Sequence, residues 1–278
     1  MRPLLRVLVS PCAARAAGLA LCTAVALTPA PRCCVAQSPM AEKVPIETLI
    51  PPPATPNLDE GRLVVSLLGK PERVEDFVFQ QVGRALVMQA TSTVSAPGQN
   101  EHSGDKSMLL VMSAADYAVE RYKSEWIMGA DTLWRGAGFS PGDTVCTIWR
   151  ESPVGGVGDR VAVPPGRIYM LDPPLYATFV AITWSLQGKV CERRPTKMLV
   201  LGARDSLVEG TVSEAATETI RWGGRPVVTR KLVISGEQTG FVAWVAPDGR
   251  LLRLEQPSAG LRVDREAPPV KKRTPRVH

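Results

Sequence analysis

The C-terminal part of the chain constrains the fold most, because it consists of short strand-like segments separated by turn residues. From Lys197 onward such segments recur about every 8–12 residues with Gly, Pro or Asp between them, which is typical of an antiparallel meander or a barrel-like sheet. The predicted strands of this part are 197–201, 206–213, 217–222, 227–235, 240–246, 250–256 and 260–265.

The clearest of these elements is a hairpin over residues 240–256. Positions 241–246 are apolar on both alternating faces, which predicts a strand that is buried on both sides. The following Pro-Asp-Gly, residues 247–249, favours a tight turn, because proline presets the first dihedral angle and glycine adopts the left-handed conformation of a three-residue loop.

The N-terminal half of the body shows the same pattern of apolar alternation bounded by turns. Residues 117–128 also fit a helical spacing in part, but their aromatic content and the neighbouring turns favour a strand. The predicted strands of this half are 62–68, 75–81, 85–94, 108–112, 117–128, 132–134, 144–149 and 160–163.

One helix is predicted, over residues 175–187. Asp172, followed by two prolines, suits an N-cap, and Gly188 suits the end of the helix. An apolar stripe predicts that one face packs on the sheet; it comprises Leu175, Phe179, Ile182 and Leu186. The predicted fold is therefore mainly β: a single strongly curved antiparallel sheet, a half-barrel or open barrel, with one packed helix near 175–187.

Residues 1–36 are predicted to be a signal peptide. Arginines precede an apolar run, 16–27, of about a dozen residues, which suits a signal core and is too short to span a bilayer. Small residues favour cleavage after Ala36, with Ala30 as the alternative. The residue before Cys22 is a leucine, which is too large for a lipid-attachment motif, so lipid anchoring is not expected. Export to the periplasm or the extracellular space is the expected location.

Three regions follow the signal. Residues 37–60 contain several prolines and suit an extended leader, residues 61–266 suit one β-rich domain, and residues 267–278 suit a basic disordered tail. The chain of 278 residues has a formal net charge of +6, but four arginines of the signal and four basic residues of the tail leave residues 37–266 near −2. A protein that binds duplex nucleic acid carries its positive charge on the folded domain, so nucleic acid is not an expected partner.

Four of the six cysteines lie in the signal, which leaves Cys146 and Cys191. Two cysteines in strand-like segments of an exported protein favour one disulfide. Two separate buried thiols remain the alternative, because the sequence does not place the two Cα atoms within the bridging range of about 4.4–6.8 Å. The mature chain has no CxxC motif and no Cys/His cluster, so neither a metal nor another cofactor is expected.

The sharpest enzyme motif is the G-x-S-x-G of residues 138–142. In hydrolases with this motif the backbone N–H after the serine helps to form the oxyanion hole, and here that residue is Pro141, which has no N–H. The two histidines are His102, in a polar loop, and His278, the last residue. We therefore interpret the motif as a surface turn rather than a nucleophile.

Other motifs are weaker. The glycine-rich residues 154–159 lack the Lys-Ser/Thr of a P-loop and the third Gly of a dinucleotide fingerprint. Residues 101–105 contain Glu, His and Asp, which are more often solvated loop residues than metal ligands. Paired carboxylates for glycoside hydrolysis cannot be recognised from sequence, because the fold sets their separation of about 5–9.5 Å; the candidates are Glu209, Glu214 and Glu237. No catalytic residue is therefore predicted.

Six tryptophans, beside only five phenylalanines, are the remaining candidates for ligand contacts. Most should lie in the core, but a sheet curved enough to hold a ligand also displays aromatic side chains in a groove. The four possible ligand-facing aromatics are Trp126, Trp184, Trp222 and Trp244.

The ending Trp244-Val245, followed by Gly249-Arg-Leu-Leu-Arg253, resembles a group of uncharacterised exported bacterial envelope proteins that also have a signal, a polar leader and one helix. That group is loosely similar in architecture to periplasmic lipoprotein-sorting and lipid-carrier proteins, in which an antiparallel sheet curls around a helix. The resemblance covers roughly the last hundred residues. It implies a fold and carries over no catalytic residue.

Three functions remain open on this basis. The first is a non-catalytic envelope protein that holds an apolar or amphiphilic ligand, such as a lipid, in the curved sheet. The second is a structural or assembly partner of another envelope protein. The third is an enzyme with an unrecognised carboxylate site.

Overall fold

A computed structural model describes residues 56–95, 104–139, 144–163, 167–187, 193–202, 204–236 and 240–268. Fifteen strands form one sheet that is not closed, and one α-helix packs on it. The prediction of a mainly β fold with a single sheet and one helix is confirmed. No helix of the described residues is long and apolar enough to cross a membrane.

The strand order follows the chain in two runs. The strands of the first run pair in sequence, each antiparallel to the next: β1 (Asn57–Leu67), β2 (Lys70–Val82), β3 (Ala85–Val94), β4 (Asp105–Ser113), β5 (Val119–Met128), β6 (Asp131–Phe139), β7 (Val145–Ser152) and β8 (Gly155–Ala162). The second run comprises β9 (Ile168–Leu171), β10 (Arg194–Val200), β11 (Ser206–Trp222), β12 (Arg225–Gly236), β13 (Gly240–Val245), β14 (Leu251–Gln256) and β15 (Leu261–Arg265). The pairing of β1 with β15 joins the two runs, so β8 and β9 are the edges of the sheet.

One pair departs from the predicted antiparallel arrangement. β9 and β10 are parallel, and the helix α1 (Thr178–Ser185) lies between them in the chain. A parallel pair needs a crossover connection, which is usually a helix. The sequence did not predict β9, because its four residues, all buried, form too short a run to show a period.

Several other strand boundaries differ from the predictions, among them those of β1 and β11. β1 begins at Asn57, within the segment predicted as leader, and pairs with β2 from that residue onward. The strands predicted at 206–213 and 217–222 are a single strand, β11, with a β-bulge between Glu214 and Ala216. A bulge interrupts the alternation that marks a strand in the sequence, which explains the predicted gap.

The hairpin predicted at 240–256 is formed by β13 and β14. The alternate side chains from Phe241 to Val245 lie in the core, and Trp244, which is only 7% exposed, lies on the opposite face. Gly249 has a φ of +90° in the turn, and a Cβ there would collide with the side chain of Gln187. The strand buried on both faces and the left-handed glycine are both confirmed.

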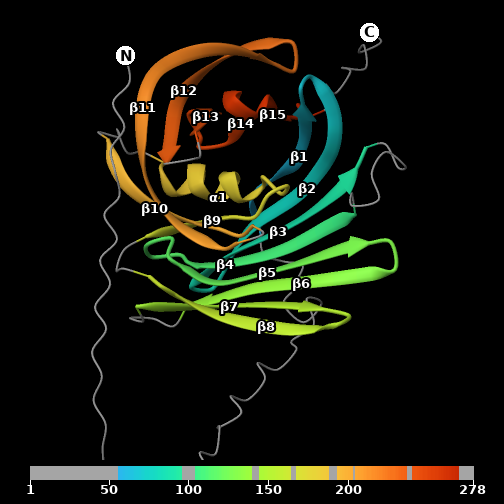
Figure 1. Cartoon of the computed structure of the whole chain (residues 1–278). Coiled ribbons are helices and arrows are strands. Elements are labelled where there is room, and N and C mark those ends of the chain that lie inside the picture. Colours follow the sequence, from blue (N-terminus) through green and yellow to red (C-terminus); the bar gives the residue numbers. More distant parts are fainter. Residues whose placement is uncertain are drawn as a thin grey trace, which may run out of the picture. The chain divides into compact units, whose positions relative to one another are not determined.

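The helix packs between strands of the two runs, on the face of the sheet that we call the inner face (Figure 1). The ring of Phe179 lies 4.7 Å from that of Phe241 on β13, and the ring of Trp184 lies 5.9 Å from that of Phe79 on β2. The gap between α1 and strands β4, β5 and β9 has a volume of about 10 Å³, which is the size of one water molecule. The interior around the helix is therefore filled by side chains.

Candidate functional site

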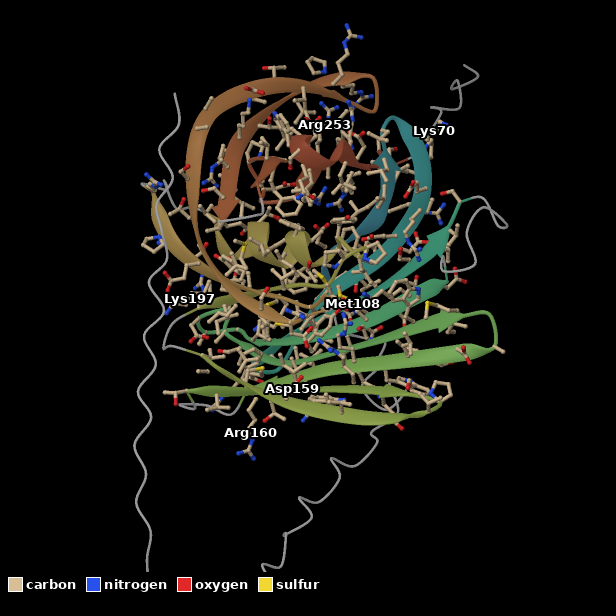
Figure 2. The ribbon with its side chains drawn as sticks, in the orientation of Figure 1. Lys70, Met108, Asp159, Arg160, Lys197 and Arg253 are labelled. Carbon is tan, nitrogen blue, oxygen red and sulfur yellow. The ribbon has the colours of Figure 1, made fainter. Side chains whose placement is uncertain are left out.

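A groove of about 900 Å³ runs along β1 to β4. Its walls are completed by Trp222, at the end of β11, and by residues 266–268, which follow β15. The apolar residues that line it are Leu58, Phe77, Val78, Ala90, Met108, Trp222, Ala267 and Pro268. Met108 is also labelled in Figure 2, where it lies in the packed centre of the sheet.

The charged side chains of the groove are largely paired with one another. Arg62 and Asp76 face each other across β1 and β2 and form an ion pair of 2.8 Å. Asp76 holds the pKa of Arg62 above its usual value through a hydrogen bond and its charge. Arg250, in the turn before β14, lies 3.9 Å from Asp59. The arginines of the groove are thus neutralised from within the protein.

A buried ion pair between Asp59 and Arg265 forms the end of the groove. The two Nη atoms of Arg265 donate to the two carboxylate oxygens of Asp59, at 2.9 and 2.5 Å. The guanidinium also lies over the ring of Phe77, with its Cζ 5.2 Å from the ring centroid. A Cβ at Gly61 would lie 3.0 Å from the guanidinium, so a glycine at this position leaves room for the pair.

The same ion pair connects the groove to more distant elements. Trp184 on α1 donates from its indole N–H to Asp59 at 3.2 Å. Trp222 donates from its indole N–H to the carbonyl oxygen of Arg265 at 2.9 Å. The end of α1 is therefore held against the start of β1, and the tip of the β11–β12 hairpin against the end of β15.

A second buried cluster is centred on Asp172, in the loop between β9 and α1. Its carboxylate forms ion pairs with Lys106 on β4, at 2.7 Å, and with Arg135 on β6, at 3.1 Å. The hydroxyls of Tyr122 and Ser124 on β5 donate to its other oxygen, at 2.7 and 2.8 Å. Burial, followed by the charge of Asp172, raises the pKa of Tyr122 well above its usual value, so this phenol stays a donor.

Glu75 on β2 holds the beginning of the helix. Its carboxylate is fully buried and accepts hydrogen bonds from the backbone N–H groups of Tyr176 and Ala177, the latter at 2.8 Å. Burial raises the pKa of Glu75 to about 7, although these hydrogen bonds oppose the shift. The expected cap, Asp172, does not cap the helix. Its carboxylate faces the sheet, where it binds Tyr122, and Glu75 of β2 accepts the hydrogen bonds at the beginning of the helix instead.

Neither Asp172 nor Glu75 lines the groove or the small gap beside α1. Arg73 beside Glu75 is likewise satisfied: it donates to the hydroxyl of Ser92 at 2.8 Å and to the carbonyl oxygen of Gly104 at 2.6 Å. Through these hydrogen bonds and ion pairs, the buried groups hold the β9–α1 loop against strands β2 to β6.

The structure brings only two of the four predicted aromatics together. Trp184 binds Asp59 and Trp222 binds Arg265, the two members of one ion pair, and Trp222 also lines the groove. Trp126 lies on β5, with the ammonium group of Lys106 5.3 Å from its ring centroid. Trp244 lies on the face opposite the core, between Lys231 and Arg253, and donates to Glu218 at 2.8 Å.

The other predicted sites have varied outcomes. Cys146 is buried in β7 and makes no disulfide with any described residue; burial raises the pKa of its thiol to about 11. Its expected partner Cys191 lies outside the described residues, as do Ser140 and His102 of the enzyme motifs. Of the candidate carboxylates, Glu214 is paired with Arg230 and Glu209 is exposed on β11, whereas Glu237 is not described. No group of three or more His, Cys, Asp or Glu in the described ranges could hold a metal ion.

Sequence reasoning missed the residues that organise the site. Asp59 and Arg265 are 206 positions apart, and Lys106 and Asp172 are 66 apart, so no local pattern links either pair. Single charged residues within apolar strands, such as Glu75 and Lys106, were the one available signal.

Comparison with known proteins adds no relative: no protein-family model, no curated protein and no solved structure matches the chain significantly.

Proposed function

We propose that this chain is an exported, non-catalytic envelope protein that holds an apolar or amphiphilic ligand, in the periplasm or outside the cell. The observation that carries the proposal is the groove of about 900 Å³ along β1 to β4. Ligand sites in proteins are mostly apolar hollows of about 300–1,000 Å³ with a few polar groups. The groove has this size, and its lining combines eight apolar residues with polar and charged ones.

The paired charges of the groove define the chemical class of the ligand. Three arginines and four carboxylates line it, and Arg62 and Arg265 each already have an acidic partner. A strongly anionic ligand would have to draw Arg265 away from Asp59, and breaking such a buried pair is costly. The Arg62–Asp76 pair is about half exposed and opposes an anion less. We therefore propose a ligand with one apolar chain and a neutral or zwitterionic polar end.

The ligand is assigned to the groove and not to the centre of the sheet. In lipid carriers the ligand occupies the concave face of a curled sheet, and we propose the same strongly curved, half-barrel form for this sheet. Here α1 and its contacts with Phe79 and Phe241 fill the inner face. The groove lies beside this filled interior, where β1 continues beyond its pairing with β15.

Titration calorimetry with lysophosphatidylcholine, kept below its critical micelle concentration, tests this assignment. Thr91 is an exposed residue of β3 that lines the groove, and Thr91→Trp would fill part of the hollow. Thr147 is an exposed threonine of β7 away from the groove, so Thr147→Trp is the matched control. We expect at least tenfold weaker binding for Thr91→Trp and unchanged binding for Thr147→Trp. Equal affinities of both variants and the parent protein would contradict the groove assignment.

A further inference from the structure

The strand β8 is one end of the sheet, and no described strand pairs with its outer edge. Its pairing with β7 runs without a bulge from Val145 opposite Ala162 to Ser152 opposite Gly155. The N–H of Val163 donates to the carbonyl oxygen of Thr144 at 2.7 Å. Because backbone groups alternate along an antiparallel strand, the odd-numbered residues of β8 bond to β7. The even-numbered residues then direct their N–H and C=O groups outward: Gly156, Gly158, Arg160 and Ala162.

This edge has few of the features that usually protect one. Natural edge strands are blunted by proline, by charged side chains, above all lysine, by bulges or by a covering segment, and the described edge carries only the charges of Asp159 and Arg160. The strand Gly155–Ala162 contains no proline, no lysine and no bulge, and seven of its eight residues are exposed. Three of the eight residues are glycines, so little side-chain volume shields the backbone. Figure 2 shows Arg160 extending from β8 away from the sheet.

We propose that β8 accepts an extended segment of a partner polypeptide by β-strand addition, an interaction that does not involve the groove. Outward N–H and C=O groups at a two-residue spacing are complementary to one ligand class, the backbone of an extended peptide. Val157, which is 65% exposed, lies on the same face as Asp159 and offers an apolar contact there.

The charges of β8 select the sequence of that segment. Asp159 and Arg160 are adjacent, so their side chains lie on opposite faces of the sheet. Cross-strand pairs of opposite charge are favourable, whereas like charges directly opposite are unfavourable. In an antiparallel partner, a glutamate opposite Arg160 followed by a lysine opposite Asp159 satisfies both charges.

A second copy of this chain satisfies the charges of Asp159 and Arg160 less well than such a segment. A two-fold axis perpendicular to the sheet brings residues of the same face opposite each other. The face of Asp159 carries only Gly155, Val157 and Val161 besides it, and the face of Arg160 carries only glycine and alanine. No symmetric register therefore places either charge opposite its complement, and registers centred on Asp159 or Arg160 place like charges together.

Backbone amide signals of the full exported chain, labelled with ¹⁵N, test the proposal. The probe is the peptide Thr-Val-Thr-Glu-Lys-Thr-Val-Thr, and its Lys-Glu isomer is the control peptide. We expect the first peptide to shift the amides of Gly156, Gly158 and Arg160 and to slow their hydrogen exchange, and the isomer to bind several-fold more weakly.

Three variants separate edge pairing from other binding. Gly158→Pro removes an outward N–H but none of the bonds to β7, so it should abolish the protection. Gly158→Ala retains the N–H, and its Cβ would lie 3.9 Å from the nearest atom outside the chain neighbours, so it should bind as the parent does. Asp159→Lys should weaken binding several-fold even if Gly158→Pro does not fold. Absence of protection at the outward amides, or binding that neither Gly158→Pro nor Asp159→Lys changes, would overturn the proposal.

Discussion

At the scale of single residues, the buried Asp172 cluster should be sensitive to substitution, because one carboxylate pairs with two cations and accepts two hydroxyl hydrogen bonds. Asp172→Asn removes the charge that neutralises Lys106, whose Nζ also contacts the carbonyl oxygen of Asp172 in a fully buried site. Breaking a buried ion pair in this way costs about 3–5 kcal/mol of unfolding free energy. Denaturant unfolding would measure this loss.

A double variant provides the control for that prediction. Lys106→Met combined with Asp172→Asn leaves no uncompensated ammonium group, and the amide oxygen of the introduced asparagine still accepts from Tyr122 and Ser124. We expect the double variant to be more stable than Asp172→Asn alone. Additive losses in the double-mutant cycle would show that the two charges are not coupled.

Glu75 gives the structure a pH dependence of defined sign. Its pKa is raised from 4.5 to about 7 by burial, so the folded protein binds a proton more tightly than the unfolded chain between these values. The contribution to stability is therefore complete below pH 4.5 and is lost as the pH rises to about 7, with a total of about 3 kcal/mol. In Glu75→Gln this part of the pH dependence should disappear, which unfolding curves at pH 5 and pH 8 would reveal. A parent protein whose stability relative to Glu75→Gln does not fall over this range would contradict the raised pKa.

At the scale of elements, the packing of β6 against β7 depends on one of two glycines that face the same tryptophan. A Cβ at Gly136 would lie 1.9 Å from the indole ring of Trp149, whereas a Cβ at Gly138 would lie 3.7 Å from it, at ordinary contact distance. Gly136→Ala should therefore lower the unfolding free energy by about 1–3 kcal/mol, as overpacking typically does, and Gly138→Ala should change it little. Thermal unfolding of the two variants would test this difference, and equal midpoints would refute it.

The elements themselves were largely predictable from the sequence, because most strands alternate regularly between turn residues. Residues 85–94 were predicted as a strand with the bounds that β3 has. The prediction failed where the local signal was absent: β9 is too short, and the bulge at Glu214 breaks the alternation of β11. The groove could not be predicted, because β11, β1 and the segment after β15 meet only in the folded chain.

At the scale of the whole described domain, one helix is fixed at both ends by carboxylates from the N-terminal strands. Glu75 binds the backbone at its beginning, and Asp59 binds Trp184 near its end. These contacts hold α1 on the inner face, and we propose the groove along β1 to β4 as the place for a ligand. The free edge at β8 lies at the end of the sheet, so the proposed ligand and the proposed partner strand use different strands.

The central claim is that the groove holds an amphiphile, and native mass spectrometry of the exported protein tests it most directly. We expect the parent protein and Thr147→Trp to carry one neutral or zwitterionic lipid per chain, and Thr91→Trp to carry none. A parent protein without any bound lipid, or a Thr91→Trp variant with the same bound lipid, would contradict the claim.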